Sequence, residues 1–193
     1  MHCNLKRMKK ICLLILKLFH YNVDAVNIPK EKKYVLAFAP HTSWTDLAVG
    51  KIALTAMGVK TTILIKKELF FFPLGALLTY IGGYPVDRKQ TKNLTDTIAE
   101  YIRGKDEVIF LISPEGTRKR VETWKRGFYH IALKADVPIA LAYLDYCERK
   151  GGIGPVYYPT GNYETDLQEI QSFYRGMKGR RKGRFFLETP LTP

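Results

Sequence analysis

The chain has 193 residues, of which 46% are hydrophobic and 25% charged, so it is long enough for one domain with a sizeable core. Its 31 lysines and arginines outnumber 18 acidic residues, and the net charge of +13 indicates a polyanionic partner: nucleic acid, an anionic bilayer, an acidic carrier protein or a phosphorylated substrate. The three cysteines and four histidines lack the spacing of zinc ligands, which argues against a structural metal. An odd number of cysteines gives no complete disulfide framework, which favours a reducing, cytoplasmic setting.

The first predicted element is an amphipathic helix within residues 1–22. Its apolar run, residues 11–19, reaches only about 13 Å as a helix, which is too short to cross a bilayer core of about 20 residues. Lys17 interrupts the run and argues against a signal peptide. One side of this helix is apolar and carries Met8, Ile11, Cys12, Ile15 and Phe19. Four lysines are available to anionic headgroups: Lys6, Lys9, Lys10 and Lys17. We expect peripheral or monotopic attachment to the cytoplasmic membrane face, with packing on the core as the alternative.

The rest of the chain, residues 23–193, is predicted to form a single domain in which buried strands alternate with helices. Strands are predicted at 34–39, 60–65, 84–87, 107–112 and 138–144, with a further edge strand at 155–159. Helices are predicted at 43–57, 91–104, 127–136 and 164–177. The apolar segment 69–82, broken by Pro73, suits a core helix or an interfacial segment. This pattern predicts an α/β fold with a mainly parallel sheet flanked by helices on both faces.

In such sheets ligands bind beyond the carboxyl ends of the strands, and the first of these loops, "PHTSWTD", carries His41 and Asp46. Within one regular helix the two side chains would point about 140° apart. They can meet only if His41 lies in the turn before the helix and Asp46 in its first turn. Ser43 and Asp46 also match a capping box, so this stretch alone leaves catalysis and helix capping both open.

Two further loops carry polar side chains to the same edge of the sheet. The loop "GGYPVDRK" delivers Arg88, and "SPEGTRKR" is a turn that displays Glu115, Thr117 and Arg118. A base with its carboxylate, two arginines and a hydroxyl suits activation of an alcohol beside a phosphate. The sequence has no GxSxG elbow and no GxxxxGK[ST] loop, which favours direct transfer without a covalent intermediate and argues against a nucleoside triphosphatase.

The order H-x-x-x-x-D, G-x-x-x-V-D-R, P-E-G-T-R and V-P-I, over residues 34–143, resembles the glycerolipid acyltransferase family, which includes the 1-acyl-glycerol-3-phosphate (lysophosphatidate) acyltransferases. The resemblance implies that His41 is the general base on the acceptor hydroxyl and that Asp46 holds it. It also implies an acceptor-phosphate site formed by Arg88, Glu115, Gly116, Thr117 and Arg118. The implied donor is a thioester of coenzyme A or acyl carrier protein, the implied acceptor is a lysophospholipid, and no metal or other cofactor is required.

The sequence departs from the commonest family pattern around these blocks. Pro40 precedes the histidine where many members have asparagine, Ser113 precedes P-E-G-T-R in place of phenylalanine, and the fourth block lacks its second proline. We therefore expect lysophosphatidate as the acceptor, with another lysolipid or a lipo-amino acid as the alternative.

The basic and aromatic segment 174–186, "YRGMKGRRKGRFF", also resembles the surfaces that bind nucleic acid. That function would leave the histidine–aspartate pair and the P-E-G-T-R block unexplained, so no nucleic-acid partner is expected. The segment is predicted instead to contact anionic lipid or an acidic acyl carrier protein, and a solvated tail is the alternative.

Overall fold

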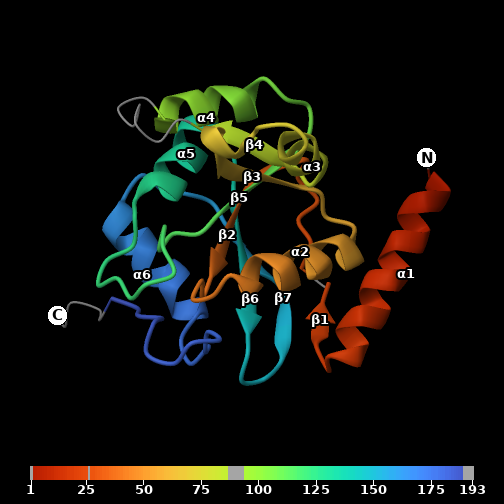
Figure 1. Ribbon diagram of the computed structural model, residues 1–193. Helices are drawn as coiled ribbons and strands as arrows, with labels where there is room; N and C mark the ends of the chain where they lie inside the picture. The colour runs from red at the N-terminus through yellow and green to blue at the C-terminus, as the bar shows by residue number, and fades with distance from the viewer. Residues whose placement is uncertain (1, 26, 87–93, 189–193) are drawn as a thin grey trace.

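The computed structural model describes residues 2–25, 27–86 and 94–188, and within these ranges seven strands form one sheet in the order β1-β7-β6-β2-β5-β3-β4 (Figure 1). The strands are β1 (Asn22–Asp24), β2 (Lys33–Ala39), β3 (Thr61–Lys66), β4 (Gly83–Val86), β5 (Val108–Ile112), β6 (Ile139–Asp145) and β7 (Lys150–Tyr157). Neighbouring strands are parallel except for β6 and β7. The predicted mainly parallel sheet is confirmed.

Helices cover both faces of this sheet, as predicted. They are α1 (His2–Leu18), α2 (Thr45–Met57), α3 (Leu74–Tyr80), α4 (Leu94–Arg103), α5 (Gly127–Ala135) and α6 (Tyr163–Phe173), with a 3₁₀ turn, η1 (Lys67–Leu69). Side chains alternate along β2, so that Val35 and Ala37 pack beneath α4, α5 and α6, whereas Leu36 and Phe38 pack beneath α2. The strand is apolar throughout because both of its faces are buried.

The connection through α3 lies on the same face as α2. The chain steps outward from β2 to β3 and then from β3 to β4, and right-handed crossovers place both connecting helices on one side of the sheet. It then returns from β4 to β5, which places α4 on the other side. None of the side chains of α3 is buried, and Phe72 is 91% exposed, so the segment 69–82 is not a core helix.

The N-terminal helix α1 packs against α2 near the β1 edge of the sheet (Figure 1). Leu16 is buried against Ala53 and Ala56, and Cys12 lies beside them. Most of the other apolar side chains of this segment face outward: Met8, Ile11, Leu13, Leu14, Leu18 and Phe19. None of the helices in the described part of the chain has both the length and the apolar character that spanning a bilayer requires. The division into a membrane-associating segment 1–22 and a domain 23–193 stays a prediction.

The carboxyl-terminal strand differs from its prediction. An edge strand was expected at 155–159, but β7 begins at Lys150 and lies between β6 and β1. The charged and glycine-rich stretch 148–152 is typical of a turn, yet Gly151 and Gly152 pair with both neighbouring strands. The edge position beside β7 belongs to β1, which has only three residues, too few for the sequence pattern to predict a strand.

Candidate active site

The candidate site lies at the carboxyl ends of β2 and β5, which are adjacent and parallel. The loop after β2 carries His41 and leads into α2, and the loop after β5 carries Glu115 and Arg118. Because parallel neighbours end at the same edge, loops that are far apart in sequence meet there. The structure therefore brings together the first and third of the predicted loops. Arg88, from the second loop, lies outside the described residues.

His41 and Asp46 are in direct contact. His41 lies in the turn before α2, Asp46 is the second residue of that helix, and Nδ1 of the imidazole is 3.2 Å from Oδ2 of the carboxylate. Nδ1 is buried and within ion-pairing distance, although its N–H direction falls outside that of a well-aligned hydrogen bond. The carboxylate therefore faces one edge of the ring, and Nε2 on the opposite edge is left for a substrate proton.

Asp46 is fully buried and surrounded by donors. Its carboxylate accepts the backbone N–H groups of Thr42 at 2.6 Å and Ser43 at 2.7 Å, and the hydroxyl of Tyr146 at 2.8 Å. Burial would raise the pKa of Asp46, but contacts from His41 and these donors outweigh it and leave the pKa below its usual value. Asp46 is therefore an anion at neutral pH.

The capping prediction holds only in part. The carboxylate of Asp46 does reach back to the N–H of Ser43, and the hydroxyl of Ser43 accepts the N–H of Thr45 at 3.3 Å. The residue at the helix cap, however, is Trp44, one position later than predicted. Asp46 thus contacts the turn and the imidazole together, so capping and histidine orientation are compatible.

Glu115 lies behind His41 and is 1% exposed. One carboxyl oxygen accepts the backbone N–H of His41 at 2.5 Å, and the other is buried without a hydrogen-bond partner among the described residues. Burial raises the pKa of Glu115 to about 8, with the His41 N–H opposing the rise and the charge of Asp46 adding to it. Glu115 is therefore a neutral acid at pH 7. Its hydrogen bond with the N–H of His41 fixes the backbone of the turn that carries the imidazole.

The P-E-G-T-R turn depends on Gly116. Its φ of +62° lies in the left-handed region that favours glycine, and its N–H donates to the carbonyl of Ser113 at 3.0 Å. The turn directs Thr117 and Arg118 into a pocket beside the start of α2. The guanidinium of Arg118 stacks over the indole of Trp44, with its central carbon 3.3 Å from the ring centroid.

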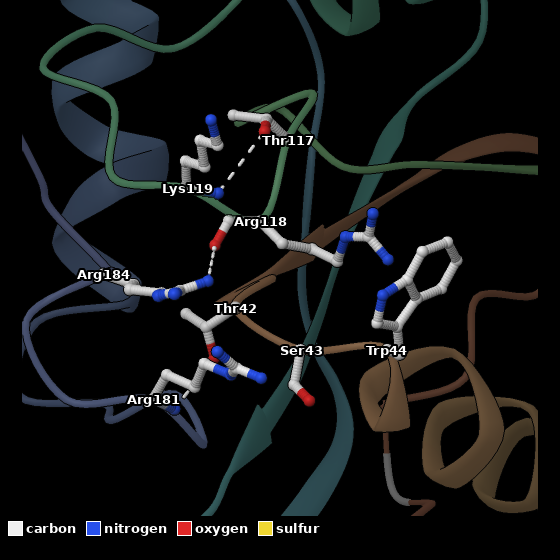
Figure 2. Close-up of a pocket in the computed structure, with 8 residues that line it drawn as sticks. All are labelled: Thr42, Ser43, Trp44, Thr117, Arg118, Lys119, Arg181 and Arg184. Carbon is white, nitrogen blue, oxygen red and sulfur yellow. Dashed lines mark hydrogen bonds between the residues drawn. The ribbon is translucent and has the colours of Figure 1, made fainter.

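This pocket has a volume of about 230 Å³, and Figure 2 shows the side chains around it. The described residues that line it are Thr42, Ser43, Trp44, Thr117, Arg118, Lys119, Arg181 and Arg184. Four of them are cations, and none is acidic. An anionic group is the ligand that such a lining can bind through charge-assisted hydrogen bonds.

Sequence reasoning did not assign five of the side chains at this site: Trp44, Lys119, Tyr146, Arg181 and Arg184. Trp44 and Lys119 lie inside the quoted loops, and their neighbours could have directed attention to them. The other three lie well beyond those loops, and the two arginines belong to the segment expected to contact lipid or a carrier protein. In the part of the chain that the structure describes, no cluster of histidine, cysteine and acidic side chains could hold a metal ion.

A family model described as Acyltransferase matches residues 21–144, which include both the histidine–aspartate pair and the P-E-G-T-R turn. The chain belongs to the acyltransferase family. The match ends before Tyr146 and before the two arginines of the C-terminal segment. The chemistry-bearing loops are therefore the family's part of this chain, whereas half of the cationic lining comes from outside it.

Two 1-acyl-sn-glycerol-3-phosphate acyltransferases are similar to parts of this acyltransferase-family chain. It is 35% identical over 85 residues to a 1-acyl-sn-glycerol-3-phosphate acyltransferase of Cocos nucifera, covering 41% of this chain and 28% of the relative. It is 29% identical over 132 residues to one of Limnanthes alba, covering 65% and 46%. The chain thus spans less than half the length of these relatives.

A solved structure shares the fold. The crystal structure of the 1-acyl-sn-glycerophosphate (LPA) acyltransferase, PlsC, from Thermotoga maritima superposes with a TM-score of 0.64. The superposition covers 88% of this chain and 76% of that one, at 20% sequence identity. At that identity the likeness concerns the fold.

Proposed function

We propose that this acyltransferase-family protein transfers a fatty acyl group from a thioester to the free hydroxyl of lysophosphatidate and so forms phosphatidate. The observation that carries the proposal is the contact between His41 and a buried, ionised Asp46, beside a pocket lined by four cations. A base next to an anion-binding pocket suits an acceptor that carries a hydroxyl near a phosphate.

In this mechanism His41 is the general base. Nε2 takes the proton of the acceptor hydroxyl while its oxygen attacks the thioester carbonyl, and Asp46 stabilises the imidazolium that forms. When the tetrahedral intermediate collapses, the carbon–sulfur bond breaks and the departing thiolate takes the proton from Nε2. The products are the ester and a free thiol, and His41 returns to its neutral form. Glu115 contributes by holding the backbone N–H of His41.

The acceptor phosphate binds beside the P-E-G-T-R turn, on the side of the cationic pocket that Arg118 lines. Arg118 provides in-plane N–H donors there while the face of its guanidinium is stacked on Trp44. Arg88 is a further proposed phosphate ligand on the basis of the family resemblance. An acceptor without a phosphate would leave these cations uncompensated, which favours lysophosphatidate over the other lysolipids and lipo-amino acids.

We further propose that the protein acts as a peripheral or monotopic enzyme on the cytoplasmic face of the membrane. Outward apolar side chains lie on α1 and, like Phe72, just before α3, and both helices are on the same side of the sheet. Trp44 and Leu47, at the start of α2, are exposed on that side as well. An apolar surface next to the site would give a lipid acceptor a short path from bilayer to base.

The proposal is tested by mass spectrometry of products from the purified full chain. The protein is supplied with acyl-CoA or acyl-acyl carrier protein and with a panel of lysolipids and lipo-amino acids in neutral detergent micelles. We expect phosphatidate to form faster than any other product. Faster acylation of an acceptor without phosphate would assign the chain to the alternative acceptor class. Absence of thioester consumption with every acceptor would refute an acyltransferase activity.

A further inference from the structure

The C-terminal segment 177–188, here called the strap, crosses the carboxyl ends of the central strands. The carbonyl of Lys178 accepts the N–H of Tyr146, just after β6, at 2.9 Å. Gly179 lies against Thr42, just after β2, so closely that an added Cβ would be 2.5 Å from that side chain. The start of the strap is therefore fixed to the loop that carries His41 and to Tyr146, whose hydroxyl donates to Asp46.

The far end of the strap is fixed as well. The carboxylate of Glu188 accepts the N–H of Trp124 at 2.9 Å, and its own N–H donates to the side chain of Gln171 at 3.0 Å. The ring of Phe185 packs beside Trp124, with centroids 6.5 Å apart. Contacts at both ends distinguish the strap from a solvated tail.

Between these anchors, two arginines of the strap lie in the cationic pocket (Figure 2). The backbone N–H of Arg181 donates to the hydroxyl of Thr42 at 3.2 Å. Nη1 of Arg184 donates to the carbonyl of Arg118 at 3.3 Å. A guanidinium has five N–H donors, so this bond leaves most of those of Arg184 for a ligand.

The charges of the pocket are uncompensated within the described part of the chain. Three exposed basic side chains elsewhere lie beside carboxylates: Arg120 with Glu122, Arg126 with Glu164, and Lys134 with Asp96. Among the described residues, no carboxylate forms an ion pair with any of the four cations of the pocket: Arg118, Lys119, Arg181 and Arg184. Like charges gathered in one pocket repel one another, and a bound anion would relieve that repulsion.

We propose that Arg181 and Arg184 of the strap, together with Arg118 and Lys119, form a binding site for a phosphomonoester. The proposal rests on the proposed function, because acyl transfer to a lysophospholipid brings phosphorylated substrates to this edge. A phosphomonoester carries a charge of about −1.5 to −2 near pH 7 and three terminal oxygens, which suits several guanidinium donors. The acceptor phosphate and the 3′-phosphate of coenzyme A share this chemistry.

A matched pair of double variants tests the site. Arg181→Gln/Arg184→Gln removes two charges that line the pocket, and Arg180→Gln/Lys182→Gln removes two charges from the same strap that do not. Calorimetry with glycerol 3-phosphate and with coenzyme A measures binding to the full chain, and thermal unfolding checks that both variants fold.

We expect the pocket variant to bind at least one of these probes with an affinity lower than that of the parent by about tenfold or more. The reason is that losing a hydrogen bond to a charged group costs more than losing one between neutral groups. The control should stay within about twofold of the parent. Arg181→Lys/Arg184→Lys, which keeps the charge, should recover part of the loss. Equal losses in the pocket variant and the control would mean a non-specific charge effect and would overturn the proposal, as would no loss in either.

Kinetics identify which substrate supplies the phosphate. If the pocket variant has a higher KM than the parent for lysophosphatidate in neutral micelles, and an unchanged KM for acyl-CoA, the site binds the acceptor. A higher KM for acyl-CoA, but not for acyl-dephospho-CoA, assigns it to the donor. Both results support a phosphomonoester site, whereas unchanged KM values for both substrates contradict it. If the parent protein acylates no lysolipid, the proposed function fails, and the calorimetric comparison still decides whether the strap binds a phosphomonoester.

Discussion

Replacing Tyr146 by phenylalanine isolates one hydrogen bond to the buried carboxylate of Asp46, the proposed partner of the base His41. The hydroxyl of Tyr146 donates to Oδ1 of Asp46 at 2.8 Å and lies 3.2 Å from the hydroxyl of Thr45. A hydrogen bond to a charged group contributes about 1.5–3 kcal/mol, and the partial exposure of Tyr146 favours the lower part of that range. For a chain of this size, a loss of about 2 kcal/mol lowers Tm by roughly 4–8 °C.

The effect of Tyr146→Phe should depend on pH in a definite direction. The folded-state pKa of Asp46 lies below its usual value, so the stabilisation by its donors is present above the unfolded pKa and is lost as pH falls through the folded pKa. The difference in unfolding free energy between parent and variant should therefore be largest near neutral pH and shrink in acid. Denaturant unfolding at several pH values measures it.

The control is Tyr34→Phe, which removes a buried hydroxyl that has no hydrogen-bond partner among the described residues. It should leave stability unchanged or raise it, because an unsatisfied buried hydroxyl is costly. Equal stability losses in the Tyr34 and Tyr146 variants, or a Tyr146 difference that does not change with pH, would refute the assignment of this hydrogen bond.

Three other predictions concern the site and the proposed membrane surface. The folded pKa of Glu115 is about 8, above its usual 4.5, so the unfolding free energy of the parent should fall, relative to that of Glu115→Gln, as pH rises from 4.5 to 8. Denaturant unfolding at pH 5 and pH 8 measures the two free energies, and an equal difference between parent and variant at both pH values would contradict the prediction. Trp44→Ala should raise the acceptor KM a few-fold through loss of the stacking on Arg118, with recovery in Trp44→Phe; steady-state kinetics would show equal KM values if the stacking were irrelevant. Leu14→Ser/Leu18→Ser should reduce sedimentation with anionic vesicles without unfolding the protein, and unchanged sedimentation would mean that the outward apolar side of α1 is not the anchor.

The sheet and the first-loop geometry could be predicted because they follow from local patterns. The strand expected at 34–39 is found at Lys33–Ala39. An apolar run between turn residues is the typical sequence of a strand that is buried on both faces. The spacing of His41 and Asp46 forbids their meeting within one helix, so a turn before the helix was the arrangement in which they could touch, and the structure has that arrangement.

The strap could not be predicted because no local pattern encodes it. Arg181 and Arg184 belong to a basic run without helical or strand periodicity, and they reach the pocket only through contacts with loops far away in the sequence. The burial of Glu115 is likewise a property of the packed sheet edge. In the sequence, P-E-G-T-R reads as a polar turn, and only the fold turns its carboxyl group inward beneath His41.

The most direct test of the central claim, that His41 is the base of an acyl transfer to lysophosphatidate, is the rate of thiol release by His41→Ala. With lysophosphatidate and acyl-CoA both saturating, the variant should be slower than the parent by about 10²–10⁴-fold, which is the usual contribution of general-base catalysis. Asp46→Asn should be impaired less severely, and thermal unfolding should show that the His41 variant is folded. A folded His41→Ala protein that releases thiol at nearly the parent rate would contradict the mechanism.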